Sequence, residues 1–144
     1  MTSRQIELVQ SSFKSVRPIL DSATLMFYDR LFELDPSLRK LFHTAREEQA
    51  RKLADMLVLV IDGLAHPEEI LGNIKALGLR HIGYGVLSEH YTTVGESLLW
   101  TLRTGLGEGF TPGTEDAWKS AYMFLASAMQ RATSAGSASA ASHK

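Results

Sequence analysis

Several chemistries are excluded by what the 144-residue sequence lacks. It contains no cysteine, so disulfides, cysteine-ligated zinc and iron–sulfur clusters are ruled out. No apolar run approaches the ~20 residues that a membrane-spanning helix needs. The formal net charge of −1 argues against nucleic acid or an anionic membrane as the main partner, because both need a concentrated basic face. The N-terminus lacks the basic-then-apolar layout of a signal peptide, so we expect a cytoplasmic protein.

The motifs of several common enzyme classes are also missing. The sequence has no His-Glu-x-x-His, no Glu-x-x-His of the di-iron bundles, no P-loop, no dinucleotide fingerprint and no Gly-x-Ser-x-Gly elbow. Sustained period-two alternation and hairpin dipeptides are absent as well. These absences exclude the familiar metal, nucleotide and serine-nucleophile sites, and they leave an all-α chain as the expectation.

Apolar residues, 44% of the chain, recur at helical spacing over most of its length. Thr2 and Gln5 fit a capping box at the start of the first helix. From residue 134 onward the sequence consists mainly of alanine, serine and glycine. These residues bury too little apolar surface to offset the entropy lost on ordering. We therefore predict a single all-α domain of six or seven helices over residues 1–133, followed by a disordered Ala/Ser-rich tail over residues 134–144.

His81 lies on the apolar face of a helix that we expect to begin near Pro67. The residues that share this face stand at helical spacing: Ile70, Ile74, Leu77, Gly78 and His81. A histidine in this position is either a hydrogen-bonded core residue or a ligand for something large bound inside. One inward histidine in an all-α domain fits a cofactor that carries its own metal and needs a single strong protein ligand. Haem is such a cofactor.

Two other polar side chains extend apolar helical faces. Tyr28 shares a face with Phe27 and Leu31, and Gln49 lies one turn before Leu53. From its helix alone, Tyr28 is most simply a buried tyrosine whose hydroxyl meets a backbone carbonyl. Gln49 is either a helix-boundary residue or a polar group placed over a pocket. The residues by themselves leave both alternatives open.

Six segments, in this order and spacing, resemble the bacterial single-domain globins and the globin part of flavohaemoglobins. The resemblance covers about residues 3 to 132. The segments are Phe27–Phe32, Pro36–Phe42 with Gln49-x-x-x-Leu53, Arg80–Val86, His90-Tyr91-x-x-Val94-Gly95-x-x-Leu98-Leu99, and Ala117-Trp118-x-x-Ala121-Tyr122. The family implies a globin fold of the three-over-three type that encloses a haem pocket.

The resemblance implies a role for each matching residue near the iron. His81 resembles the proximal iron ligand, and Tyr28 and Gln49 resemble the polar pair on the distal side, where gas binds. Leu53 is similar to the apolar residue beside the bound gas.

The remaining matches imply contacts with the porphyrin and with the proximal histidine. Phe42 is similar to the phenylalanine that packs on the haem face, and Tyr91 to the tyrosine that hydrogen-bonds near that histidine. Residues implied to line the pocket are Val86, Val94 and Leu98. Arg80 and Lys52 are candidate partners of the haem propionates.

The function that the resemblance implies is reversible binding of dioxygen by haem b, for storage, delivery or buffering. An alternative is nitric oxide dioxygenation at the same haem with electrons from a separate reductase; another is gas or redox sensing. The expected ligands are O2, NO and CO, and the expected state is a monomer or homodimer. Flavohaemoglobins carry a proximal glutamate where counting from Trp118 places Thr133, which weakens the case for a dioxygenase-tuned site. A helical interaction module without a cofactor is the remaining alternative.

Overall fold

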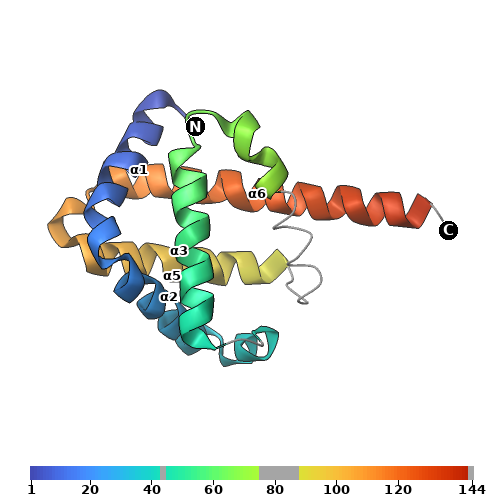
Figure 1. The fold of residues 1–144 in the computed structure, drawn as a ribbon, viewed down its shortest axis with the longest axis horizontal. Helices are drawn as coiled ribbons and strands as arrows, with labels where there is room; N and C mark the ends of the chain where they lie inside the picture. Colours follow the sequence, from blue (N-terminus) through green and yellow to red (C-terminus); the bar gives the residue numbers. More distant parts are fainter. Residues whose placement is uncertain (43–44, 75–87, 143–144) are drawn as a thin grey trace.

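The computed structural model describes residues 1–42, 45–74 and 88–142, with backbone alone for residues 88 and 131–142. The described residues form helices and turns and contain no strand, so the all-α prediction is confirmed (Figure 1). Residues 67–74 are helical, and short 3₁₀ segments follow α1, α2 and α5. The long helices are α1 (Ser3–Val16), α2 (Leu20–Leu34), α3 (Arg46–Asp62), α5 (Ser88–Leu106) and α6 (Pro112–Ser142).

Local sequence signals set several of these boundaries. The capping box predicted at the first helix is formed: the Gln5 backbone N–H donates to the Thr2 hydroxyl, and the Gln5 side chain accepts from the Thr2 N–H. Pro18 lies in the 3₁₀ turn between α1 and α2, where proline cannot continue the hydrogen-bond ladder. After α2 the chain forms a short 3₁₀ helix, Pro36–Leu41, whose first turn is capped by the Asp35 carboxylate.

The main core lies between α1, the end of α3 and helices α5 and α6. Phe13 of α1 and Trp118 of α6 pack with ring centroids 6.3 Å apart, and both are almost fully buried. The Trp118 indole N–H donates to the Ser12 hydroxyl, so burying this ring leaves no unpaired donor. In Figure 1, α5 and α6 run across the molecule and α3 crosses their direction steeply.

A second, smaller core cluster lies between α2, α3, α5 and the Pro36–Leu41 turn. It is rich in aromatic residues, and four of its five buried members come from α2 and the turn. The buried members are Phe27, Tyr28, Leu31, Leu38 and Ala50. Five of the predicted site residues belong to this cluster or pack against it: Tyr28, Phe42, Leu53, Val94 and Leu98.

Helix α6 continues to Ser142, past the point where the sequence predicts a disordered tail (Figure 1). Alanine is the strongest helix former, so extending an existing helix through this segment costs little per residue. The predicted domain limit at residue 133 stays a prediction. Among the described residues, none of the helices has the length and apolarity to cross a bilayer.

Candidate functional site

Tyr28 occupies the centre of the smaller cluster. Its ring packs edge-on against Phe27, with centroids 5.0 Å apart, and against Phe42, with centroids 5.4 Å apart. The residue is 8% exposed, and α2 turns it inward because it shares a helical face with Phe27 and Leu31. Edge-to-face contacts on two sides fix the ring, so the direction of its hydroxyl is set by packing.

A cavity of about 170 Å³ opens beside this ring. The volume is many times the ~10–15 Å³ that a cavity needs to hold one water molecule. Tyr28 comes from α2, Phe42 follows the 3₁₀ turn, and Gln49 comes from the first turns of α3, so three separate segments meet at one small space. The full lining is Tyr28, Phe32, Arg39, Phe42, Arg46 and Gln49.

The surroundings of the Tyr28 hydroxyl favour its protonated form. Burial raises the pKa of Tyr28 to about 12, and no hydrogen bond to another described group contributes to the shift. At neutral pH the phenol is therefore protonated and remains a hydrogen-bond donor. A donor held beside a cavity can serve a small acceptor that enters it.

Three more predicted pocket residues pack around the same cluster. Leu53 of α3 and Val94 and Leu98 of α5 are partly buried against it. They come from α3 and α5, the helices that pack against α2, and they add apolar surface around the cluster that holds Tyr28. The structure therefore brings Tyr28, Phe42, Leu53, Val94 and Leu98 together, with Gln49 at the shared cavity.

Lys52, predicted as a propionate partner, is not among the residues that line the cavity. Its side chain is 57% exposed and its ammonium lies 4.0 Å from the Glu48 carboxylate on the same helix. Its proposed role stays a prediction. The cations that do line the cavity are Arg39 and Arg46, which sequence reasoning missed. Arg39 lies three residues before Phe42, and Arg46 lies three residues before Gln49. Residues three apart share a helical face, so this spacing could have identified both arginines as pocket residues.

Arg46 is fixed by a bidentate ion pair across the two helices that flank the cavity. Its Nε and Nη2 atoms donate to the two carboxylate oxygens of Asp29 at 2.8 and 2.6 Å. The Arg46 hydrogen bonds, aided by the charges of Arg46 and Arg39, hold the pKa of Asp29 below its usual value. Asp29 follows Tyr28 on α2, and Arg46 lies three residues before Gln49 at the start of α3. The pair therefore links the two helices close to Tyr28 and Gln49.

Tyr91, predicted near the proximal histidine, lies apart from this cavity in the main core. Its backbone carbonyl accepts a hydrogen bond from the Tyr122 hydroxyl of α6. Desolvation raises the pKa of Tyr91, and burial with the nearby Tyr91 phenol raises that of Tyr122. Gly95 permits the contact, since a Cβ there would lie 2.8 Å from the Tyr122 ring. This hydrogen bond and the close contact at Gly95 hold the first turns of α5 against α6.

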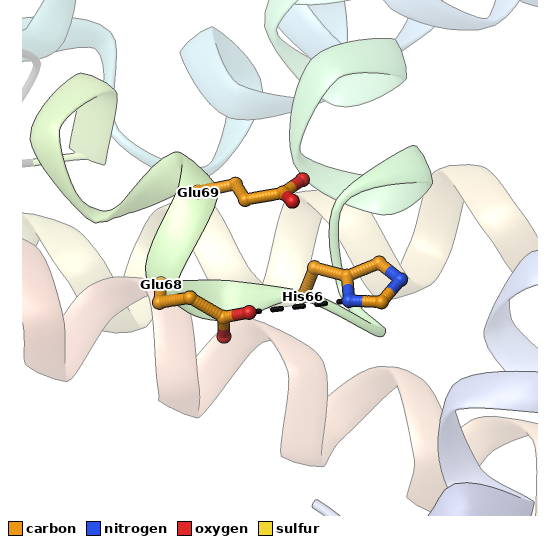
Figure 2. A group of neighbouring side chains, drawn as sticks. All are labelled: His66, Glu68 and Glu69. Carbon is orange, nitrogen blue, oxygen red and sulfur yellow. Dashed lines mark ion pairs between the residues drawn. The ribbon is translucent and has the colours of Figure 1, made fainter.

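A separate group of possible metal ligands lies on the surface (Figure 2). Figure 2 shows His66, Glu68 and Glu69 at the start of the helical residues 67–74, and their ligand atoms all lie within 4.8 Å of one another. The His66 Nδ1 atom is 3.9 Å from a Glu68 carboxylate oxygen. All three are exposed. Acidic side chains in a first helical turn are favoured by the helix dipole, which explains the grouping without an ion.

Comparisons with known proteins identify the family to which this fold belongs. The globin family model matches residues 25–129. The chain belongs to the globin family. This confirms the resemblance seen in the sequence, and the globin fold prediction with it. Membership implies a haem group and gas ligands such as dioxygen and nitric oxide.

Individual relatives of this globin differ in length. A flavohemoprotein of Deinococcus radiodurans is 31% identical over 132 residues, which is 90% of this chain but 33% of that protein. The chain thus spans about a third of the length of the curated flavohemoproteins it matches. Neuroglobin-1 of Oncorhynchus mykiss is 30% identical over 148 residues, with 91% of each chain covered.

Among solved structures, an engineered carbene transferase, RmaNOD, described as a candidate nitric oxide dioxygenase of Rhodothermus marinus, superposes with a TM-score of 0.86. It is 28% identical, and the match covers 100% of this chain and 99% of that one. The two chains therefore share the globin fold over their whole length.

Three predicted haem-site residues lie outside the described residues: His81, Arg80 and Val86. Their roles stay predictions. The described side of the pocket fits a haem by its chemistry. The aromatic rings of Phe32 and Phe42 suit a flat apolar macrocycle, Tyr28 supplies a donor for a small ligand, and the arginines form a cationic border suited to carboxylates.

Proposed function

We propose that this globin is a haem-b protein that binds dioxygen reversibly, with His81 as the iron ligand and Tyr28 and Gln49 as donors to the bound gas. The observation that carries the proposal is the placement of Tyr28. It is a buried phenol, protonated at neutral pH, and it lines one small cavity together with Gln49. Storage, delivery and buffering of oxygen all use this same binding step.

A haem iron would supply reversible ligation of dioxygen and of nitric oxide, with partial transfer of negative charge to the ligand. The rest of the proposal concerns the chain. The Tyr28 hydroxyl and the Gln49 amide donate hydrogen bonds to that charge, and each bond stabilises the ligand by about 1–3 kcal/mol in a dry pocket. Together they favour tight binding and slow release, because ~1.4 kcal/mol is a tenfold change in a dissociation constant.

The other proposed roles complete the pocket. Phe42 packs on the haem face, and Leu53, Val94, Leu98 and Val86 exclude water from it. An apolar border strengthens the electrostatic effect of each donor by lowering the local dielectric. Toward the haem carboxylates we propose Arg80 and Lys52 as partners, and Tyr91 as a hydrogen-bonding residue near His81.

The decisive experiment is the absorption spectrum of the purified protein in its ferric, ferrous and oxygen-exposed forms, repeated for His81→Gly. We expect a strong haem band that shifts with oxygen, that is lost or altered in His81→Gly, and that imidazole restores. The control is His66→Gly, which removes an exposed histidine that does not line the cavity and should leave the spectrum unchanged. Absence of a haem band after haem supplementation would refute the proposal.

Nitric oxide dioxygenation is the second candidate, favoured by the whole-length structural match to the Rhodothermus marinus protein and by the flavohemoprotein relatives. In this role the same donors would hold dioxygen while nitric oxide enters, and a separate reductase would return the electron. Consumption of many equivalents of nitric oxide per haem with a reductase present supports it. Consumption that stops after one equivalent leaves oxygen binding as the function.

A further inference from the structure

A buried hydrogen bond links α5 to the backbone of α2 directly beside Tyr28. The Ser97 hydroxyl of α5 donates to the Phe27 carbonyl oxygen at 2.7 Å, and Ser97 is fully buried. That carbonyl belongs to the peptide group that joins Phe27 to Tyr28, from which the Tyr28 side chain departs. Inside a helix a carbonyl already accepts from the N–H four residues later. The serine therefore adds a link between two helices and does not rescue an unpaired acceptor.

Two other buried hydroxyls on the same helices are bonded differently. Thr24 of α2 donates to the Leu20 carbonyl at 2.9 Å, and Thr101 of α5 donates to the Ser97 carbonyl at 2.9 Å. Each bond reaches one turn back along its own helix, which is the usual way for a helical serine or threonine to pair its hydroxyl. This local arrangement satisfies the group without joining helices. The Ser97 hydroxyl instead crosses to α2, so its bond fixes one helix relative to the other.

The residues before and after Tyr28 are held by two different helices. The Phe27 carbonyl accepts from Ser97 of α5, and the Asp29 carboxylate accepts from Arg46 of α3. The side chains of the ion pair are about half exposed, so water competes with that bond, whereas the serine bond is buried and water does not reach it. The Phe27 ring also packs edge-on against Tyr28. A shift of Phe27 would therefore carry the Tyr28 ring with it.

We propose that Ser97 is a positioning residue, which sets the place from which the Tyr28 hydroxyl donates to a ligand in the cavity. A hydrogen bond weakens steeply when its distance or angle departs from the optimum, so a small movement of α2 against α5 reduces what the donor contributes. The inference rests on the proposed function, in which Tyr28 is a donor to bound gas. It adds a residue that does not itself line the cavity.

The experiment measures oxygen dissociation from the ferrous haem-loaded protein and the C–O stretching frequency of its carbon monoxide complex, which responds to hydrogen bonds donated to the ligand. Ser97→Ala should raise the oxygen dissociation rate by about three- to tenfold, a part of the effect of losing the donor. Its C–O frequency should move toward that of Tyr28→Phe. Ser97→Cys keeps a weaker donor at the same place, so both of its values should lie between those of serine and alanine.

Thr24→Val is the matched control. It removes a buried hydroxyl from the same face of α2 as Phe27 and Tyr28, but this hydroxyl is bonded within α2. Both readouts should therefore stay as in the unchanged protein. Equal changes in Thr24→Val and Ser97→Ala would overturn the proposal, because loss of any buried hydroxyl near α2 would then suffice.

A double variant tests whether Ser97 acts through Tyr28. In the Tyr28→Phe background, Ser97→Ala should change neither readout further, because the donor that it positions is already gone. Equal acceleration of oxygen release in both backgrounds would overturn the proposal. A lowered unfolding free energy in Ser97→Ala with an unchanged oxygen rate would overturn it too, since the bond would then be structural only. If the alanine variant takes up no haem, the same comparison is made with Ser97→Cys.

Failure of the proposed function is distinguishable from failure of this inference. A protein without a haem band, or a Tyr28→Phe variant with an unchanged oxygen rate, refutes the donor role of Tyr28 and the role of Ser97 with it. A normal haem band, faster oxygen release in Tyr28→Phe and an unchanged rate in Ser97→Ala reject only the role of Ser97.

Discussion

Tyr28 and Tyr122 are two buried phenols in different regions of one globin. Tyr122 lies between α5 and α6 in the main core, and its hydroxyl donates to the Tyr91 carbonyl. Tyr28 lies in the smaller cluster between α2 and α3, and it lines a cavity of about 170 Å³. Burial raises the pKa of both phenols, so protonation does not distinguish them.

What separates them is the partner of the hydroxyl. A buried phenol bonded to a backbone carbonyl is satisfied within the protein, and removing it leaves the carbonyl unpaired. A buried phenol beside a cavity can donate to a molecule that enters. From the sequence, Tyr28 could have been of the first kind; in the structure, Tyr122 has that role. We therefore expect changes at Tyr122 to affect stability and changes at Tyr28 to affect ligand binding.

The largest effect should come from Tyr28→Phe, measured as the oxygen dissociation rate of the haem-loaded protein. Losing a donor worth about 1–3 kcal/mol should raise that rate by roughly ten- to a hundredfold. The free energy of unfolding should change little, because no hydrogen bond to another described group is lost. An unchanged oxygen rate would place Tyr28 with Tyr122 as a structural tyrosine.

Next in size is Gly95→Ala, which tests the close approach of α5 and α6. The added Cβ would lie 2.8 Å from the Tyr122 ring, so the helices must separate, at a cost of about 1–3 kcal/mol in unfolding free energy by urea denaturation. Gly72→Ala is the matched control, since its Cβ would meet nothing within 4 Å. That control should stabilise the helix by up to about 1 kcal/mol. Equal effects at both glycines would contradict the close packing.

Tyr122→Phe should then lower the unfolding free energy by about 1 kcal/mol, because the Tyr91 carbonyl loses its donor. The oxygen dissociation rate should stay as in the unchanged protein. Tyr28→Phe should thus change the oxygen dissociation rate and leave the unfolding free energy nearly unchanged, whereas Tyr122→Phe should do the reverse. A large change in the oxygen rate of Tyr122→Phe would show that the two regions are coupled.

The smallest effect concerns the ion pair that joins the helices of the ligand-binding region. The Arg46 hydrogen bonds lower the pKa of Asp29 below its usual value of 3.8 in the folded state. The pair therefore contributes stability above pH 3.8, and this is lost as the pH falls through the lowered pKa. Arg46→Ala should unfold at a slightly higher pH during acid titration followed by circular dichroism.

The contribution is small because both side chains of the pair are about half exposed and solvent screens them. Arg51→Ala, which removes an exposed arginine from the same helix, is the control and should leave the acid transition in place. Identical acid transitions in Arg46→Ala and in the unchanged protein would show that the pair adds nothing measurable.

Helical periodicity predicted much of this fold. The capping box at Thr2 and the shared inward face of Phe27, Tyr28 and Leu31 follow from local spacing and caps, and the structure confirms them. Tertiary contacts could not be predicted in the same way. The pairing of Arg46 with Asp29 joins residues 17 apart in sequence, and neither residue belongs to an apolar pattern.

The sequence by itself determined the helical class of this chain and, through the order of its motifs, the globin family to which it belongs. These properties depend on spacing along one helix, which is local. Only the tertiary structure decided which buried tyrosine is satisfied and which borders a cavity, and which arginines lie beside that cavity. Hydrogen bonding and charge pairing depend on distances between helices far apart in sequence, and packing alone fixes those distances.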